Sequence, residues 1–172
     1  MKKILMTLAL AMTTFVAANA QKFALVDMEY ILKNVPAYER ANEQLNQISK
    51  KWEGEIEAIL KDVEAQYKKY QSEAVFLSDA QKTKTEEAIM AKEKQASDLK
   101  KKYFGAEGEL FKKRQSLMAP IQDEIYNAVK DVCDQRGYQL VLDRASDGAG
   151  IIFASPTIDI SNEVLQKLGY AN

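Results

Sequence analysis

The chain has 172 residues, with 24 basic residues against 25 acidic ones, a single cysteine and no histidine. This near-neutral charge is untypical of nucleic-acid-binding proteins, which normally carry a basic surplus. Without histidine the chain cannot form Ser-His-Asp or Cys-His catalytic groups or most zinc sites, and one cysteine cannot form an intrachain disulfide. We therefore expect no metal, no cofactor and no nucleic-acid partner.

The N-terminal segment has the three parts of a secretory signal peptide. Lys2 and Lys3 precede an apolar run over residues 4–16, and the small residues Ala18 and Ala20 form a cleavage site. The run is too short to span a bilayer comfortably, although an uncleaved anchor is the alternative. We expect cleavage after Ala20, export, and a soluble mature chain with at most peripheral membrane association.

A strand and a short helix are expected before the first long helix. Residues 23–27 are apolar and partly β-branched, which favours a strand. Residues 28–35 favour one or two helical turns with Asp27 as N-cap, and Pro36 ends them. Residues 37–74 contain no proline and a single glycine, which predicts one long helix.

The apolar residues of this long helix follow an eleven-residue repeat, with spacings of 4, 3, 4, 4, 3, 4, 4, 3 and 4 from Ala41 to Ala74. The repeat puts one apolar stripe on a single helix face. The same spacings recur from Leu99 to Val132, where Arg114 is the one polar member. An eleven-residue period corresponds to about 3.67 residues per turn, which predicts a nearly straight helical pair.

Between the two stripes, Ser78 and Gln81 form a capping box that predicts the start of a second helix. Long helices joined by a short connection are antiparallel neighbours. The return helix is expected to end near Arg136 and Gly137. Inside it, the glycines at positions 105 and 108 either permit close helix approach or act as a bend.

Two further strands are expected over residues 138–143 and 150–154, joined by a turn at 146–148. A short amphipathic helix over 159–168 follows, with Asp159 or Ser161 as its cap. Because a helical hairpin returns the chain to its starting end, the early strand can pair with both late strands in one small sheet. One short helix cannot cover both faces of that sheet, so burial alone predicts an oligomer without fixing the copy number.

The sequence resembles the Skp/OmpH family of periplasmic chaperones over essentially the whole mature chain. The resemblance is carried by the export signal, the strand ending in Val26-Asp27, the Lys/Glu-rich hairpin and the closing segment VLDRASDGAGIIFASPTIDISNEVLQKL. It implies a trimer in which a β-rich body carries three helical arms that enclose a cavity. It also implies that the arms hold unfolded outer-membrane proteins without ATP.

The expected fold is therefore mainly α with a small β part. A signal peptide over residues 1–20 precedes a β-containing oligomerisation body, formed by 21–37 and 120–172, and a helical hairpin arm over 38–119. The apolar strand residues are candidates for the contact between copies: Phe23, Leu25, Val26, Leu140, Leu142, Ile151 and Phe153.

Exposed apolar clusters mark interaction surfaces. Candidates for client contact are therefore the apolar residues outside the helix stripes: Val75, Phe76, Leu77, Phe104, Phe111 and Met118. The alternatives are that Phe76 caps the hairpin tip internally, and that Phe104 and Phe111 simply broaden the apolar seam.

The expected function is an ATP-independent, non-enzymatic holding chaperone for exported outer-membrane β-barrel proteins in the periplasm. The alternative is a coiled-coil spacer or adaptor that docks a folded envelope partner. Charge distinguishes this chain from the well-known, strongly basic members of the family, because removal of Lys2 and Lys3 leaves 22 basic residues against 25 acidic ones. Long-range steering of an anionic client is therefore expected to be weak.

Overall fold

The computed structural model describes residues 22–146, 148 and 150–170. The predicted signal peptide and Asp147 of the predicted turn lie outside the described residues. The chain forms two compact units. The hairpin unit comprises Leu32–Asn127, and the sheet unit joins the residues up to Ile31 with those from Ala128 onward.

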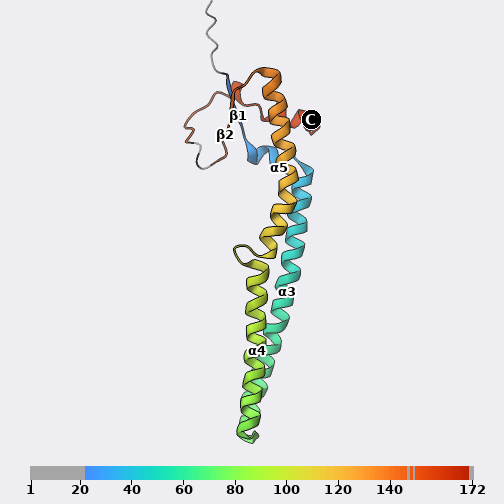
Figure 1. Cartoon of the computed structure of the whole chain (residues 1–172), viewed down its shortest axis with the longest axis vertical. Coiled ribbons are helices and arrows are strands. Elements are labelled where there is room, and N and C mark those ends of the chain that lie inside the picture. The colour runs from blue at the N-terminus through green and yellow to red at the C-terminus, as the bar shows by residue number, and fades with distance from the viewer. Residues whose placement is uncertain (1–21, 147, 149, 171–172) are drawn as a thin grey trace, which may run out of the picture. The chain divides into compact units, whose positions relative to one another are not determined.

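The hairpin unit is built around two long antiparallel helices (Figure 1), α3 (Pro36–Glu73) and α4 (Asp79–Phe104), joined by the 3-10 turn η1 (Ala74–Phe76). Pro36 occupies the first turn of α3, where its missing N–H leaves no hydrogen bond unmade. At the start of α4, the Ser78 hydroxyl accepts a hydrogen bond from the Gln81 backbone, and the Gln81 side chain accepts one from the Ser78 N–H. The predicted hairpin and capping box are confirmed.

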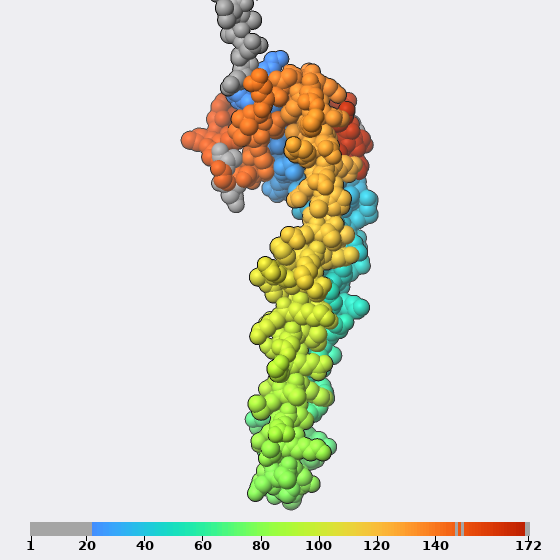
Figure 2. Space-filling view, in the orientation of Figure 1, coloured from blue at the N-terminus to red at the C-terminus, as the bar shows by residue number. Residues whose placement is uncertain are grey.

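The apolar stripe of α3 contributes four buried residues to the hairpin core. Ala41, Leu45, Ile56 and Val63 are buried, whereas Tyr67 remains half exposed. Figure 2 shows the atoms of α3 and α4 packed against each other along the hairpin. The predicted period therefore identifies the packed face of α3 correctly, except at Tyr67.

The return limb is two helices rather than the single one expected, because α4 ends at Phe104 and α5 (Glu109–Arg136) begins after a short loop (Figure 1). The Gly108 N–H donates to the Gly105 carbonyl across this loop, at 2.9 Å. A Cβ atom on Gly105 would lie 2.5 Å from the Lys101 carbonyl oxygen, and one on Gly108 would lie 2.8 Å from the Tyr103 carbonyl oxygen. Such contacts require displacement of backbone, so glycine suits both ends of this break.

The sheet unit contains two parallel strands, β1 (Phe23–Val26) and β2 (Leu140–Asp143). Phe23 pairs with Leu140, so the predicted pairing of the two chain ends is confirmed. The third strand predicted over 150–154 is wrong, since these residues are irregular. The second edge of β1 is instead met by an isolated bridge from Leu25 to Asp159.

The sheet unit also contains the start of the short helix α2 (Met28–Lys33), the end of α5, a 3-10 turn and a last short helix. Gly137 directly follows the end of α5, and its φ of +74° and the hydrogen bond from its N–H to the Cys133 carbonyl confirm the predicted glycine cap. The 3-10 turn η2 (Pro156–Ile158) precedes α6 (Ser161–Lys167). The last helix therefore starts two residues later than predicted, with Ile160 rather than Asp159 or Ser161 at its cap position.

Candidate functional site

The tip of the hairpin exposes apolar side chains. Val75 is 81% exposed and Phe76 is 85% exposed, whereas Leu77 is half-buried. The alternative in which Phe76 caps the tip internally is therefore wrong. The 3-10 turn presents a small apolar surface to solvent.

Further along the hairpin, three aromatic rings join α3 to the end of α4. The rings of Trp52 and Tyr103 stack with centroids 4.5 Å apart, and Phe104 meets both rings edge-on. The Tyr103 hydroxyl donates to Glu55 at 2.9 Å, and this hydrogen bond raises the pKa of the tyrosine. Phe104 is thus half-buried in an aromatic cluster, in agreement with the alternative that it broadens the apolar seam between the helices.

Two shallow grooves lie beside this aromatic cluster. One has a volume of about 460 Å³ and is lined by Glu53, Ile56, Glu57, Leu60, Lys100 and Phe104. The other has a volume of about 510 Å³ and is lined by Ile48, Lys51, Trp52, Glu109, Lys112, Lys113 and Ser116. Among the remaining predicted contact residues, Phe111 is about half exposed and Met118 is half-buried on α5.

The half of the hairpin nearest the tip combines buried apolar residues with polar contacts between α3 and α4. Ile89 and Ala96 are the buried residues of α4. Across the seam, Lys92 forms an ion pair with Asp62, which lowers the pKa of that carboxyl, and the Tyr70 hydroxyl donates to Glu86. Packing between α3 and α4 is therefore less apolar here than the α3 stripe alone suggests.

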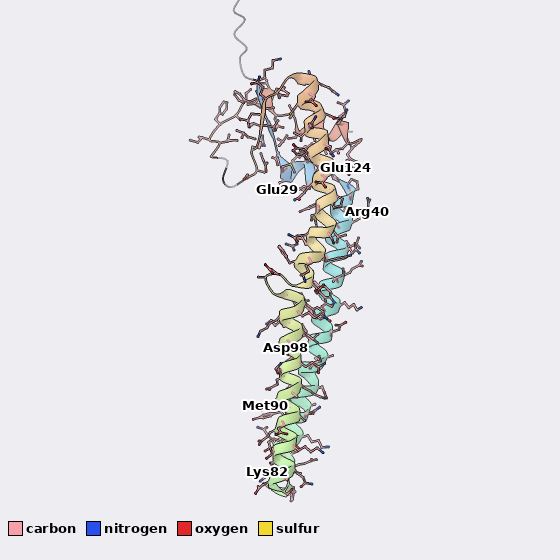
Figure 3. All side chains as sticks on the ribbon, in the orientation of Figure 1. Glu29, Arg40, Lys82, Met90, Asp98 and Glu124 are labelled. Carbon is pink, nitrogen blue, oxygen red and sulfur yellow. The ribbon has the colours of Figure 1, made fainter. Side chains whose placement is uncertain are left out.

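Sequence reasoning missed two exposed apolar residues of the hairpin. Met90, labelled in Figure 3, is 66% exposed on α4, and Leu60 is about half exposed on α3. Both lie outside the apolar stripes, which is the criterion that identified Phe111 and Met118. A full helical-wheel search of both helices would have found them.

The residues predicted for contact between copies divide into a buried and an exposed group. Leu25 and Val26 belong to the core of the sheet unit, and Ile151 is half-buried. Phe23, Leu140, Leu142 and Phe153 are exposed, and so is the neighbouring Ile152. Phe23 faces Leu140 in the strand register, so both strands contribute to this apolar surface.

A polar cluster that the sequence did not reveal ties the strand ends to the last helix. The Arg144 guanidinium contacts Asp27 at 3.2 Å and Asp159 at 3.1 Å. Asp159 accepts from the hydroxyl of Ser161, and the same hydroxyl oxygen accepts from the Asp27 backbone. These contacts give a structural role to the VLDR and DIS parts of the closing segment.

Within residues 22–146, 148 and 150–170, no group of three or more Cys, Asp or Glu side chains is arranged to hold a metal ion. Over the same residues, no helix is both long and apolar enough to cross a membrane. The distinctive surfaces are apolar ones, on the hairpin and on the two strands.

Sequence comparison assigns this architecture to a family. The family described as "Outer membrane protein (OmpH-like)" matches residues 22–168. The chain belongs to the OmpH-like family. Two similar curated proteins are each called chaperone protein Skp. The one from Yersinia enterocolitica is 27% identical over 94% of both chains. The one from Pectobacterium atrosepticum is 25% identical over 98% of this chain and 99% of the relative.

The OmpH-like fold also occurs in a solved structure. The crystal structure of an OmpH-like protein from Caulobacter crescentus CB15 superposes with a TM-score of 0.71, covering 85% of this chain and 82% of the other, at 13% identity. The fold is mainly helical, with a long hairpin and a small sheet, as predicted. The OmpH-like family is one of non-enzymatic chaperones, so the chain is not an enzyme.

Proposed function

We propose that the protein is an ATP-independent holding chaperone that keeps unfolded outer-membrane β-barrel proteins from aggregating in the periplasm. Membership of the OmpH-like family and the curated Skp relatives support a chaperone role. The export signal predicted over residues 1–20 supports the compartment. A holding chaperone needs surfaces that bind weakly at many points rather than a catalytic group.

The observation that carries this proposal is the set of exposed apolar side chains along the hairpin, led by Val75 and Phe76 at the tip. Each such contact contributes about 25 cal/mol per Å² of apolar area removed from water. Several small contacts hold an apolar client and still release it, because each one breaks independently. The shallow grooves beside the aromatic cluster add further contact area of the same kind.

We further propose that three copies assemble through the sheet unit, the predicted body, and that their hairpins, the predicted arms, enclose the client. The exposed side chains of Phe23, Leu140, Leu142 and Phe153 support contact between copies, because a monomer gains nothing by leaving such a surface in water. The outer edge of β2 has no neighbouring strand among the described residues. An open apolar edge of this kind favours pairing with another chain.

The test is dilution of a urea-unfolded β-barrel protein into buffer with the mature chain, followed by light scattering. Wild type should suppress scattering, and the double variant Val75→Ser with Phe76→Ser should suppress it less while sedimenting as wild type does. Tyr126→Ser removes a comparably exposed aromatic residue outside the proposed contacts and should behave as wild type.

Unchanged aggregation in the presence of wild type would refute the holding function. Saturable binding to a native envelope protein, with no binding to unfolded chains, would instead support the adaptor alternative. Loss of the oligomer in the tip variant would show that the tip residues belong to the fold.

A further inference from the structure

The groove formed by α3 and the start of α5 is distinguished by its charge. Ile48 and Trp52 are its apolar members, and both are half-buried. Three lysines and one glutamate contribute its charged groups: Lys51, Lys112, Lys113 and Glu109. The groove therefore combines an apolar floor with a net positive rim.

Most of this positive charge is uncompensated. Lys112 contacts Glu109 at 3.4 Å, which offsets one of the three ammonium groups. Lys51 and Lys113 have no ion pair in the part of the chain that the structure describes, whereas Lys61, Lys68 and Lys92 on the same hairpin each hold a carboxylate. Two ammonium groups thus border the Trp52 and Ile48 side chains without a carboxylate of their own.

The second groove provides an internal contrast. Its apolar residues are Ile56, Leu60 and Phe104, and its charged residues are Glu53, Glu57 and Lys100. Because a helix advances about 100° per residue, Lys51 and Glu57 lie on opposite flanks of the α3 stripe. The two flanks of one hairpin therefore present similar apolar surface with different charge.

We propose that the lysine-rimmed groove binds client segments in which an aromatic or branched aliphatic side chain neighbours a carboxylate. The inference rests on the proposed function, because it assigns a preferred segment to a client-holding hairpin. The apolar side chain packs on Trp52 and Ile48 while the carboxylate lies among the lysines. In a nearly neutral protein, such local complementarity selects segments where long-range steering cannot.

The test uses two synthetic peptides that differ only in the residues flanking a central phenylalanine, aspartates in one and lysines in the other. Trp52 is the only tryptophan of the chain, so its fluorescence reports binding at the groove. The mature protein should bind the aspartate peptide about fivefold to tenfold more tightly at low salt, and the difference should shrink as salt screens it. Equal binding of the two peptides, or binding of neither, would overturn the proposal.

Charge reversal locates the effect. Lys51→Glu with Lys113→Glu should abolish or invert the preference, because neither lysine has an ion pair to lose among the described residues. Lys69→Glu with Lys84→Glu makes the same change in net charge at exposed lysines outside the groove and should keep the preference. Identical behaviour of the two double variants would refute the assignment.

Aggregation of an unfolded outer-membrane protein, measured on the same samples, separates the two levels of inference. If the wild-type chain holds this client but shows no peptide preference, the groove proposal is refuted and the holding function stands. If the wild-type chain does not prevent aggregation of this client, the proposed holding function is refuted. The wild-type peptide comparison is decisive even where a variant fails to fold.

Discussion

At the scale of single residues, Phe76 shows how local backbone determines exposure. The 3-10 turn η1 places it at the very end of the hairpin, where neither α3 nor α4 can cover its ring. The sequence places Phe76 at the tip but leaves open whether the ring folds inward. That choice depends on the turn's dihedral angles, which no residue pattern in this segment specifies.

Cys133 is a residue whose chemistry follows from its surroundings. It is half-buried in the last turns of α5, and burial, with a smaller effect from the carboxylate of Asp134, raises the pKa of its thiol. We expect iodoacetamide to modify the folded protein slowly at pH 8 and faster as the pH rises above the ordinary thiol range, because only the thiolate reacts. Mass spectrometry at several pH values measures the rate.

The urea-unfolded chain is the control for this experiment and should react at the rate of a free cysteine. A folded protein that reacts equally fast at pH 8 would contradict the expected shift. Cys133 directly follows Val132, the last residue of the predicted stripe, a position that predicts a buried thiol, whereas the structure leaves it half-buried.

At the scale of elements, the break between α4 and α5 depends on glycine at two positions. A methyl group on Gly108 would lie within 2.9 Å of three backbone atoms, whereas one on Gly54, inside α3, meets nothing within 4 Å. We expect Gly108→Ala to destabilise the protein by about 1–3 kcal/mol, because backbone must shift to accept the methyl group.

Gly54→Ala is the matched control and should stabilise by about 1 kcal/mol, since alanine is the better helix former. Urea unfolding of both variants at one protein concentration compares them. A neutral or stabilising Gly108→Ala would show that the loop relaxes without cost, and would remove the steric reason for the break.

Elements with local signals are predictable from this sequence, and those that depend on distant partners are less so. The capping box at Ser78 and the glycine cap at Gly137 need only neighbouring residues, and both are confirmed. The apolar run at 150–154 has strand-like composition, but the pairing predicted for it requires the second edge of β1 to be free. In this chain Asp159 meets the edge of β1, and nothing in the local composition predicts that bridge.

The candidate surfaces follow the same division. The sequence places Val75 and Phe76 at a turn between long helices and so identifies the tip, whereas the exposure of their side chains depends on the geometry of the turn. The lysine-rimmed groove combines residues 48–52 with residues 109–116, and it depends on the helix break, which the sequence left undecided. The ion pairs of Arg144 likewise join three segments that no spacing rule connects.

At the scale of the whole molecule, the exposed apolar surface of the sheet unit predicts dependence on association. Leu140→Ser with Leu142→Ser should shift the protein to smaller species in sedimentation velocity, because both side chains lie on the exposed apolar surface of β2. Its thermal stability should also fall, since oligomers are stabilised by mass action.

Met90→Ser, which removes an exposed apolar side chain from α4, serves as the control and should sediment as wild type does. A wild-type protein that sediments as a folded monomer would contradict both the predicted assembly and the cage of hairpins proposed from it. A double variant that still sediments as wild type would place the contact between copies elsewhere.

The parallel pairing of Phe23 with Leu140 also determines the order in which the molecule can form. A chain that emerges N-terminus first presents β1 long before its partner strand exists, whereas the contacts of α3 with α4 are completed much earlier. The apolar strand β1 therefore stays unpaired until nearly the whole polypeptide has been synthesised. A protein that we propose holds unfolded chains thus passes through a stage in which its own first strand is unpaired. A nascent chain truncated before residue 140 should remain protease-sensitive at this N-terminal strand.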